Sequence, residues 1–240
     1  MLAHIAEAAD LTKTDTVLEI GPGLGTLTSE LLRRAGRVIA IEFDEMLAAK
    51  LPGQFPGKNL RVISGDILDF DLSTLPHGYK VVANVPYYIT SKIVEKLMTA
   101  DNKPSRSVLL VQREVAERIA ASAGDMSILA VSVAIFADAQ LGVFVPRQYF
   151  TPPPKVDSQV VILTTRQTPL VAPEDERALF RVVKAGFASR RKKLRSSIAA
   201  GLAISKPSAE ELLRHAGINP ELRAEALTIE QWIRLARDAV

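Results

Sequence analysis

Short apolar runs alternate with amphipathic stretches along the first two thirds of the chain. The runs contain mostly Val, Ile, Leu and Ala with little polar alternation, which is typical of strands buried on both faces. They predict strands at 16–20, 38–42, 60–63, 80–83 and 107–111. Helical periodicity before and after them predicts helices at 2–9, 27–35, 45–51, 90–98 and 113–122. This regular alternation predicts an α/β fold with a doubly wound, mostly parallel sheet.

The pattern changes towards the end of the sheet and again after residue 166. Apolar runs at 139–145 and 160–164 predict two late strands in an antiparallel hairpin, and the run at 128–135 fits a helix or a strand. Beyond a linker, the expected helices are 173–189, 193–202, 208–216 and 228–239, with turns at Gly201, Lys206-Pro207 and 217–220. We therefore expect a sheet domain at 1–167 and a small all-helical domain at 168–240.

Positive charge is concentrated in the expected helical domain. The whole chain has 30 Lys and Arg against 27 Asp and Glu, which gives a formal net charge of +3. Residues 168–240 hold 13 of these cations and 9 of the acids, and the stretch 178–208 holds eight cations and no acid. A polyanionic partner is therefore expected to bind mainly through the C-terminal part.

Composition excludes several classes of protein. The chain has no cysteine, so disulfides and thiolate metal sites are ruled out. Its histidines, His4, His77 and His215, are far apart, so no zinc site is expected. No apolar run is long enough to cross a membrane, and the N-terminus lacks the pattern of a signal peptide. These features predict a cytoplasmic protein, which we expect to be a monomer.

A glycine-rich loop with Gly21, Gly23 and Gly25 follows the first predicted strand and opens a helix. Glycines there let the backbone approach a ligand closely. The pattern fits any nucleotide site in a Rossmann-like sheet, or merely a tight turn. Glu19 narrows the choice, because a carboxylate so close to the loop suits a cationic ligand such as S-adenosylmethionine better than a pyrophosphate.

Side chains after the second and third strands extend this candidate cofactor site. Glu42 ends the second strand, where a carboxylate can accept both ribose hydroxyls. An ordinary solvated acid would occupy the same position. Phe43 is placed to pack on adenine. Asp66 and Ile67 follow the third strand, and Asp66 is expected to accept from the adenine amino group, a role compatible with capping a helix.

The sequence Asn84-Val85-Pro86-Tyr87, at the end of the fourth strand, is the sharpest candidate for chemistry. An aromatic amine is a poor nucleophile because its lone pair is delocalised into the ring. The Asn84 side-chain oxygen and the Val85 carbonyl would each accept one hydrogen bond from this amine and so favour a pyramidal nitrogen. Pro86 would fix the turn, and Tyr87 would stack on the base. The alternative is a polar turn with Tyr87 packed inward.

Two further stretches are candidates for contacts with a nucleic acid. Phe150 opens a stiff, proline-rich segment and is expected to be the second aromatic face for the base, unless it packs in the core. A basic stretch at the start of a helix is expected to bind phosphates, since no neighbouring acid in the sequence would pair with it. The alternative is a solvated charged face. Its cations are Arg190, Arg191, Lys192, Lys193 and Arg195.

Together, these motifs resemble those of the ribosomal RNA adenine dimethyltransferases, most closely of the KsgA type. The similar segments cover nearly the whole chain: 19–28, 84–87, 112–118, 150–158 and 187–195. The resemblance implies a Rossmann-like methyltransferase sheet with a helical C-terminal domain. It also implies dimethylation by S-adenosylmethionine at N6 of two adjacent adenosines near the 3′ end of small-subunit (16S) rRNA within a 30S-like particle, and a role in ribosome biogenesis.

The same resemblance assigns residues to these roles. It implies cofactor contacts at Gly21, Glu42, Asp66 and Asn84, with Asn84, Tyr87 and Phe150 around the target base. Two departures stand out. Val85 replaces the family's leucine, which matters little if the backbone carbonyl is the acceptor. The family also has a preceding segment with Gln-Asn/His-Phe-Leu and basic residues that this sequence lacks, so we expect weakened cofactor binding and activity.

Three alternatives remain at this point. The macrolide-resistance methyltransferases modify one large-subunit adenine and share fold, cofactor and catalytic turn. The stretches 152–158 and 190–195 favour the small-subunit enzyme over them. A second alternative is a ribosome-assembly factor whose catalysis is secondary. The third, a DNA adenine methyltransferase, is weaker because no segment resembles a DNA target-recognition domain.

Overall fold

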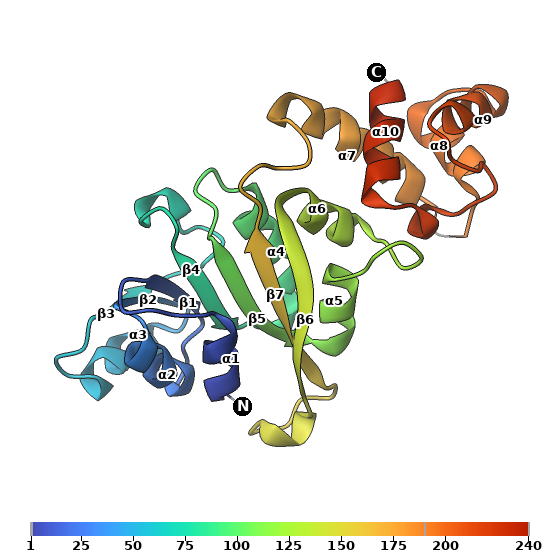
Figure 1. Ribbon diagram of the computed structural model, residues 1–240. Coiled ribbons are helices and arrows are strands. Elements are labelled where there is room, and N and C mark those ends of the chain that lie inside the picture. The colour runs from blue at the N-terminus through green and yellow to red at the C-terminus, as the bar shows by residue number, and fades with distance from the viewer. Residues whose placement is uncertain (1, 190, 240) are drawn as a thin grey trace. The chain divides into compact units, whose positions relative to one another are not determined.

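The computed structural model describes residues 2–189 and 191–239. Within these ranges the strands form one seven-stranded sheet in the order β3-β2-β1-β4-β5-β7-β6 (Figure 1). Their bounds are β1 Thr16–Ile20, β2 Arg37–Glu42, β3 Leu60–Ser64, β4 Lys80–Asn84, β5 Arg106–Gln112, β6 Ala137–Val145 and β7 Ser158–Thr165. Strands β1 to β5 are parallel, and β7 runs antiparallel to both β5 and β6. The expected α/β sheet and its late antiparallel hairpin are confirmed.

The chain folds into two compact units. Of the described residues, the sheet unit comprises 2–117 and 137–166, and the helical unit comprises 118–136, 167–189 and 191–239. The helices of the first part of the chain are α1 Leu2–Ala8, α2 Thr26–Arg34, α3 Glu45–Lys50, α4 Thr90–Thr99 and α5 Arg113–Ile119. Those that follow are α6 Ile128–Phe136, α7 Pro173–Phe187, α8 Leu194–Leu202, α9 Lys206–His215 and α10 Ile229–Asp238. Each helix within the described ranges is too short or too polar to cross a membrane.

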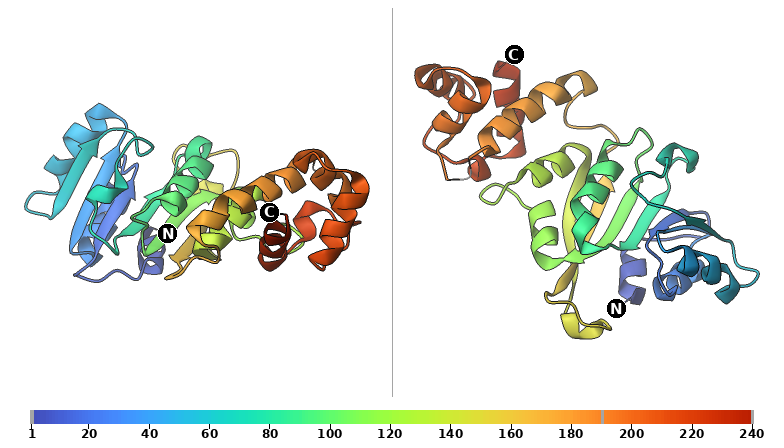
Figure 2. Two further views of the ribbon diagram at one scale, coloured as in Figure 1. Left: turned by 90° about the horizontal axis from the view of Figure 1, so that it is seen from above. Right: turned by 180° about the vertical axis from the view of Figure 1, so that it is seen from behind.

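Helices cover both faces of the sheet, with α1 and α2 on one face and α4 on the other (Figure 2). The central strands are therefore buried on both sides, which is why their sequences show so little polar alternation. The cluster on the α1 and α2 face joins Ile5, Leu27 and Leu31 to strand residues such as Val82 and Val108. This packing fixes the strand ends, from which the candidate site is built.

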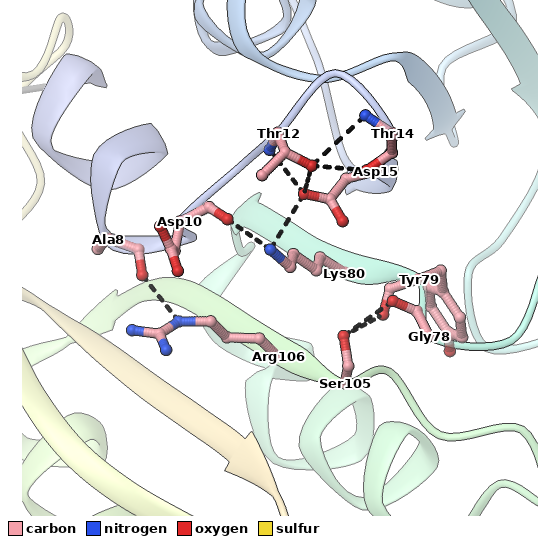
Figure 3. A network of polar contacts seen from close by, with 10 residues as sticks. All are labelled: Ala8, Asp10, Thr12, Thr14, Asp15, Gly78, Tyr79, Lys80, Ser105 and Arg106. Atoms are coloured by element: carbon pink, nitrogen blue, oxygen red, sulfur yellow. Dashed lines mark hydrogen bonds and ion pairs between the residues drawn. The ribbon is translucent and has the colours of Figure 1, made fainter.

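Two basic side chains tie the C-terminal end of α1 to the sheet (Figure 3). Arg106 Nε donates to the Ala8 carbonyl over 2.9 Å. Lys80 Nζ donates to the Asp10 carbonyl and lies 3.1 Å from Asp15 Oδ2. Cations are stabilising there because the last carbonyls of a helix lack intrahelical partners and carry partial negative charge. Both side chains project from the amino ends of their strands, so this anchor lies at the edge opposite to the candidate site.

Glycines set the helix packing in the helical unit. Gly201 lies inside α8, and a Cβ on it would come within 2.4 Å of the Ala185 Cβ of α7. A Cβ on Gly186 would come within 2.4 Å of the Trp232 ring, which is fully buried and lies 5.4 Å from the Phe187 ring between centroids. The predicted turn at Gly201 is therefore wrong, because this glycine serves close helix packing.

The predicted turn at Lys206-Pro207 is also wrong. These residues open helix α9, with Pro207 in its first turn and the Ser205 hydroxyl accepting from the backbone N–H of Ser208. A proline is tolerated there because the first N–H groups of a helix have no intrahelical partner. The segment 128–135, which fitted a helix or a strand, is helical.

Candidate active site

The predicted cofactor residues gather at one edge of the sheet. Strands β1 to β4 are parallel, so their carboxyl ends lie at the same edge. The strand order reverses between β1 and β4, and ligands of open α/β sheets bind at such a switch point. Glu19, Glu42, Asp66 and Asn84 stand at or just after the ends of these four strands.

The three glycines of the loop after β1 are required for different reasons. Gly21 and Gly23 have φ angles of 67° and 54°, in the left-handed region that favours glycine. A Cβ on either would meet no described atom within 4 Å, so both face open space. Gly25 also has a positive φ, and a Cβ there would come within 2.6 Å of Leu51 Cδ1. The first two glycines thus leave a ligand room, and the third lets α2 begin against its neighbours.

Glu19 is a buried carboxyl beneath this loop, with 1% of its surface exposed. Within the described chain neither carboxyl oxygen has a hydrogen-bond partner of ordinary geometry. Burial raises its pKa to about 8; the neighbouring Thr28 hydroxyl offsets part of the rise, and Glu42 adds to it. A buried acid without a partner would be stabilised by a cationic ligand, as expected from the sequence.

Glu42 holds the glycine loop in place. One of its carboxylate oxygens accepts from the Gly23 N–H over 2.9 Å, and the other accepts from the Asp44 N–H over 2.9 Å. It is a buried residue rather than the solvated acid that was the alternative. Its neighbour Phe43 is 74% exposed, so its ring is accessible to a ligand.

After β3, Asp66 is partly buried and caps the following turn. Its Oδ1 accepts from the Leu68 N–H over 2.8 Å. The helix-capping role considered from the sequence is not found, because a turn rather than a helix follows Asp66. Ile67 is buried, so only its backbone is placed to contact a ligand. The cofactor roles of both residues stay predictions.

A cleft of about 320 Å³ lies beside the end of β4. The predicted catalytic residues all line it, together with two prolines: Asn84, Val85, Pro86, Tyr87, Phe150, Pro152 and Pro154. Asn84 is exposed, and its amide makes no hydrogen bond to any residue that the structure describes. The Ile89 N–H donates to the Pro86 carbonyl over 3.2 Å, which closes the turn. The fold thus brings Phe150 next to the Asn84 turn, far from it in the sequence, and leaves the amide available to a ligand.

Two residues of the proline-rich segment were assigned no role from the sequence. The Ser158 hydroxyl lies 2.7 Å from the Tyr87 hydroxyl. Asp157 accepts from the Arg147 N–H through its side chain and from the Arg113 N–H through its carbonyl. Both residues belong to the stretch singled out in the sequence, but only the folded chain reveals their contacts.

The basic stretch does not behave as a uniform surface. Lys193 pairs with Glu221, and Arg195 lies 3.2 Å from Glu210 and 3.1 Å from Glu221. These hydrogen-bonded cations lower the pKa of both glutamates. The expectation that no acid would pair with the stretch is therefore wrong for Lys193 and Arg195.

The remaining cations of the stretch differ. Arg191 and Lys192 are exposed and have no carboxylate partner within the described ranges. Arg190 lies outside the described residues. Any binding of phosphates by the described part of this stretch is thus expected mainly from Arg191 and Lys192.

Comparisons with known proteins agree with this arrangement. The family model described as ribosomal RNA adenine dimethylase matches residues 1–239. A relative from Dehalococcoides mccartyi, named ribosomal RNA small subunit methyltransferase A, is 46% identical over 243 residues, which cover 98% of this chain and 82% of the relative.

Two solved structures are similar over nearly their whole length. A dimethyladenosine transferase from Plasmodium falciparum has a TM-score of 0.84 at 30% identity, with 98% of this chain and 93% of that chain covered. The 23S rRNA methyltransferase ErmE has a TM-score of 0.81 at 31% identity, with 99% and 96% covered. The fold and the sequence motifs thus point in the same direction.

Proposed function

Because the chain belongs to the ribosomal RNA adenine dimethylase family, we propose that it transfers methyl groups from S-adenosylmethionine to N6 of two adjacent adenosines near the 3′ end of small-subunit rRNA. The observation that carries this proposal is the cleft shared by Asn84, Tyr87 and Phe150. It combines a free amide with two aromatic side chains at the carboxyl edge of the sheet, as a base with an exocyclic amine requires.

The glycine-loop edge suits S-adenosylmethionine, which supplies an electrophilic methyl group when bound. Glu19 offers a buried carboxyl group without a hydrogen-bond partner of ordinary geometry in the described chain, and a cationic ligand would favour its ionised form. Gly21 and Gly23 leave open space above the loop. Glu42 and Asp66 are assigned to the ribose and to the adenine amino group, and Phe43 to the adenine face. Glu42 would keep at least one of its backbone hydrogen bonds while it accepts from a hydroxyl, because each carboxylate oxygen has two lone pairs.

The cleft residues prepare the target amine. In the first transfer the Asn84 side-chain oxygen and the Val85 carbonyl each accept a hydrogen bond from N6, which draws the nitrogen lone pair out of the ring. In the second transfer one of the two acceptors binds the single N–H that remains. Tyr87 and Phe150 hold the base by stacking, which contributes about 1–3 kcal/mol per stacked base. No strong general base is needed, because the amine loses its proton readily once it is methylated.

The small-subunit substrate is favoured over the large-subunit one. The relative at 46% identity carries the small-subunit name, whereas ErmE, a 23S rRNA methyltransferase, is 31% identical. The helical unit with Arg191 and Lys192 would hold rRNA phosphates of a 30S-like particle. We further propose a monomeric, cytoplasmic protein that acts during ribosome biogenesis.

Labelled S-adenosylmethionine, offered with undermethylated small subunits, large subunits and free rRNA, would test the proposal. Digestion of the RNA and mass spectrometry of its nucleosides identify the product. We expect dimethyladenosine from small subunits alone, and none with the variant Asn84→Ala, although this variant should still bind the subunit. Product only from large-subunit RNA would instead support the resistance-type reaction.

A further inference from the structure

Each of the two aromatic residues of the cleft has an exposed tyrosine as its neighbour in the chain. Tyr88 follows Tyr87 and is 85% exposed, and Tyr149 precedes Phe150 and is 63% exposed. Large aromatic side chains bury 150–250 Å² when they pack, so leaving two of them in water forgoes considerable stabilisation. Exposed aromatic side chains beside such a cleft are therefore typical of a binding site whose ligand covers them.

The local backbone directs these tyrosines away from the protein. Tyr88 lies in a short 3₁₀ turn, Tyr87–Ile89, whose first residue is tied to Ser158. Tyr149 ends a second 3₁₀ turn, Arg147–Tyr149, which is closed by the Phe150 N–H donating to the Arg147 carbonyl. Successive residues of a 3₁₀ turn point in directions about 120° apart, since the turn has three residues. Tyr87 can thus line the cleft while Tyr88 points elsewhere. Phe150 follows the second turn in extended backbone and lines the cleft, while Tyr149 before it is exposed.

Two positively charged side chains, those of Arg147 and Lys155, belong to the same segment of the chain as Tyr149. Arg147 Nη1 donates to the Lys155 carbonyl over 3.2 Å, and neither side-chain cation forms an ion pair among residues 2–189 and 191–239, although the Asp157 carboxylate accepts from the Arg147 backbone N–H. Arg147 and Lys155 line a second cleft of about 530 Å³, which also includes Arg113 and the acids Glu114, Glu117 and Asp157. The adjacent Pro154 lines the cleft of Asn84, Tyr87 and Phe150. Exposed aromatic rings combined with unpaired cations are the features by which proteins bind single-stranded nucleic acids.

We propose that Tyr88 and Tyr149 stack on the nucleotides that flank the target adenosine, and that Arg147 and Lys155 bind the phosphates of that strand. This inference rests on the proposed function and deepens it. Two adjacent adenosines cannot occupy one cleft together, so the second must be held outside while the first is modified. A tyrosine at the rim of the cleft keeps that adenosine unpaired and close to the cleft.

Fluorescence of 2-aminopurine tests the stacking directly, because stacking quenches this base. A hairpin RNA with two adjacent adenosines in its loop would carry 2-aminopurine at each adenosine and at each flanking position in turn. We expect the wild-type protein to quench the probe at a flanking position. The variants Tyr88→Phe and Tyr149→Phe, which retain the ring, should quench it equally.

The alanine variants distinguish stacking from mere exposure. Tyr88→Ala and Tyr149→Ala should leave the probe bright and weaken RNA binding roughly 5- to 100-fold, with unchanged cofactor affinity and melting temperature. Leu141→Ala, an exposed apolar position on β6 in the same unit, is the matched control and should behave as wild type. RNA affinity within twofold of wild type in both alanine variants, with quenching intact, would overturn the inference. If only one of the two alanine variants behaves as wild type, the stacking role of that tyrosine is rejected.

The stacking assay needs no methyl transfer, so it separates this inference from the proposed function. Tyrosine-dependent quenching without methylation of small-subunit RNA would reject the proposed substrate and retain the stacking platforms. Methylation of small-subunit RNA without any flanking quench would do the reverse. If the protein methylates small-subunit RNA, Tyr88→Ala and Tyr149→Ala should also raise the ratio of singly to fully modified adenosine pairs. The corresponding phenylalanine variants should not.

Discussion

The Tyr87 hydroxyl lies 2.7 Å from the hydroxyl of Ser158, which is fully buried at the start of β7. This hydrogen bond joins the turn after β4 to the proline-rich loop that carries Phe150. The two halves of the base cleft come from distant parts of the sequence, and here they are connected by side chains. The bond therefore sets the position of the Tyr87 ring relative to Phe150.

Breaking this bond should affect RNA turnover more than cofactor binding. Tyr87→Phe and Ser158→Ala each remove one partner, and a hydrogen bond of this kind contributes about 0.5–1.5 kcal/mol. We expect each variant to lower kcat/KM for RNA roughly 2- to 10-fold. Because both remove the same interaction, the double variant should be no worse than the more severe single one. Additive losses in a double-mutant cycle would show that the two hydroxyls act independently.

Glu19 should make stability depend on pH. Its pKa is raised by burial from 4.5 to about 8, so the folded protein keeps this proton at pH values where the unfolded chain has lost it. The folded state is therefore favoured most below about pH 4.5, and that advantage is lost as the pH rises to about 8. Glu19→Gln removes the titration and should stabilise the cofactor-free protein at pH 9 by an amount on the order of a few kcal/mol.

Thermal unfolding of the wild type and of Glu19→Gln across this pH range tests the direction of this pH dependence. The difference in free energy of unfolding between Glu19→Gln and wild type should become more favourable to the variant as the pH rises from 5 to 9. A constant difference would mean that Glu19 does not titrate in this window. The same variant should bind S-adenosylmethionine more weakly, because a glutamine cannot ionise when the cationic ligand binds.

Only some cations of the basic stretch pair with acids, so substitutions in it should change the salt dependence of RNA binding unequally. Arg191→Ala or Lys192→Ala should each lower the slope of log K against log salt by roughly 1, as expected for the loss of one phosphate contact. Lys193→Ala should change the slope less, because Lys193 already pairs with Glu221. Affinities measured between low and moderate salt would test this order, and equal slopes for all three variants would contradict it.

Close helix packing makes Gly201 sensitive to substitution. Gly201→Ala would place a methyl group within 2.4 Å of the Ala185 Cβ, so α7 and α8 would have to move apart. Overpacking of this kind costs about 1–3 kcal/mol. Gly53→Ala is a suitable control, because a Cβ there meets no described atom within 4 Å. Chemical denaturation should show a clear loss for the first variant and almost none for the second.

The strands were the most predictable part of the fold. Runs such as Val38–Ile41 are apolar because they are buried on both faces, so their sequence records their environment directly. The candidate cleft was partly predictable for the same reason, since Asn84 ends such a run. The place of β7 between β5 and β6 was not predictable, because a hairpin can dock by either strand.

The predictions from the sequence were wrong or missing where the role of a residue depends on a partner that is distant in the chain. Gly201 reads as a turn until Ala185 is seen against it. Lys193 and Arg195 read as free cations because Glu210 and Glu221 approach them only in the folded chain. Ser158 drew no prediction, since nothing in a linear pattern marks which hydroxyl will meet Tyr87.

The insertion of β7 between β5 and β6 has a consequence for synthesis of the chain. Strand β5 is complete at Gln112, yet its outer edge is paired only by Ser158–Thr165. While the intervening residues emerge from the ribosome, β5 presents an unpaired row of N–H and C=O groups beside the apolar side chains of Val108–Val111. A nascent chain arrested in this interval is open to edge-to-edge aggregation, and arrival of β7 removes that hazard at the same time as it completes the cleft.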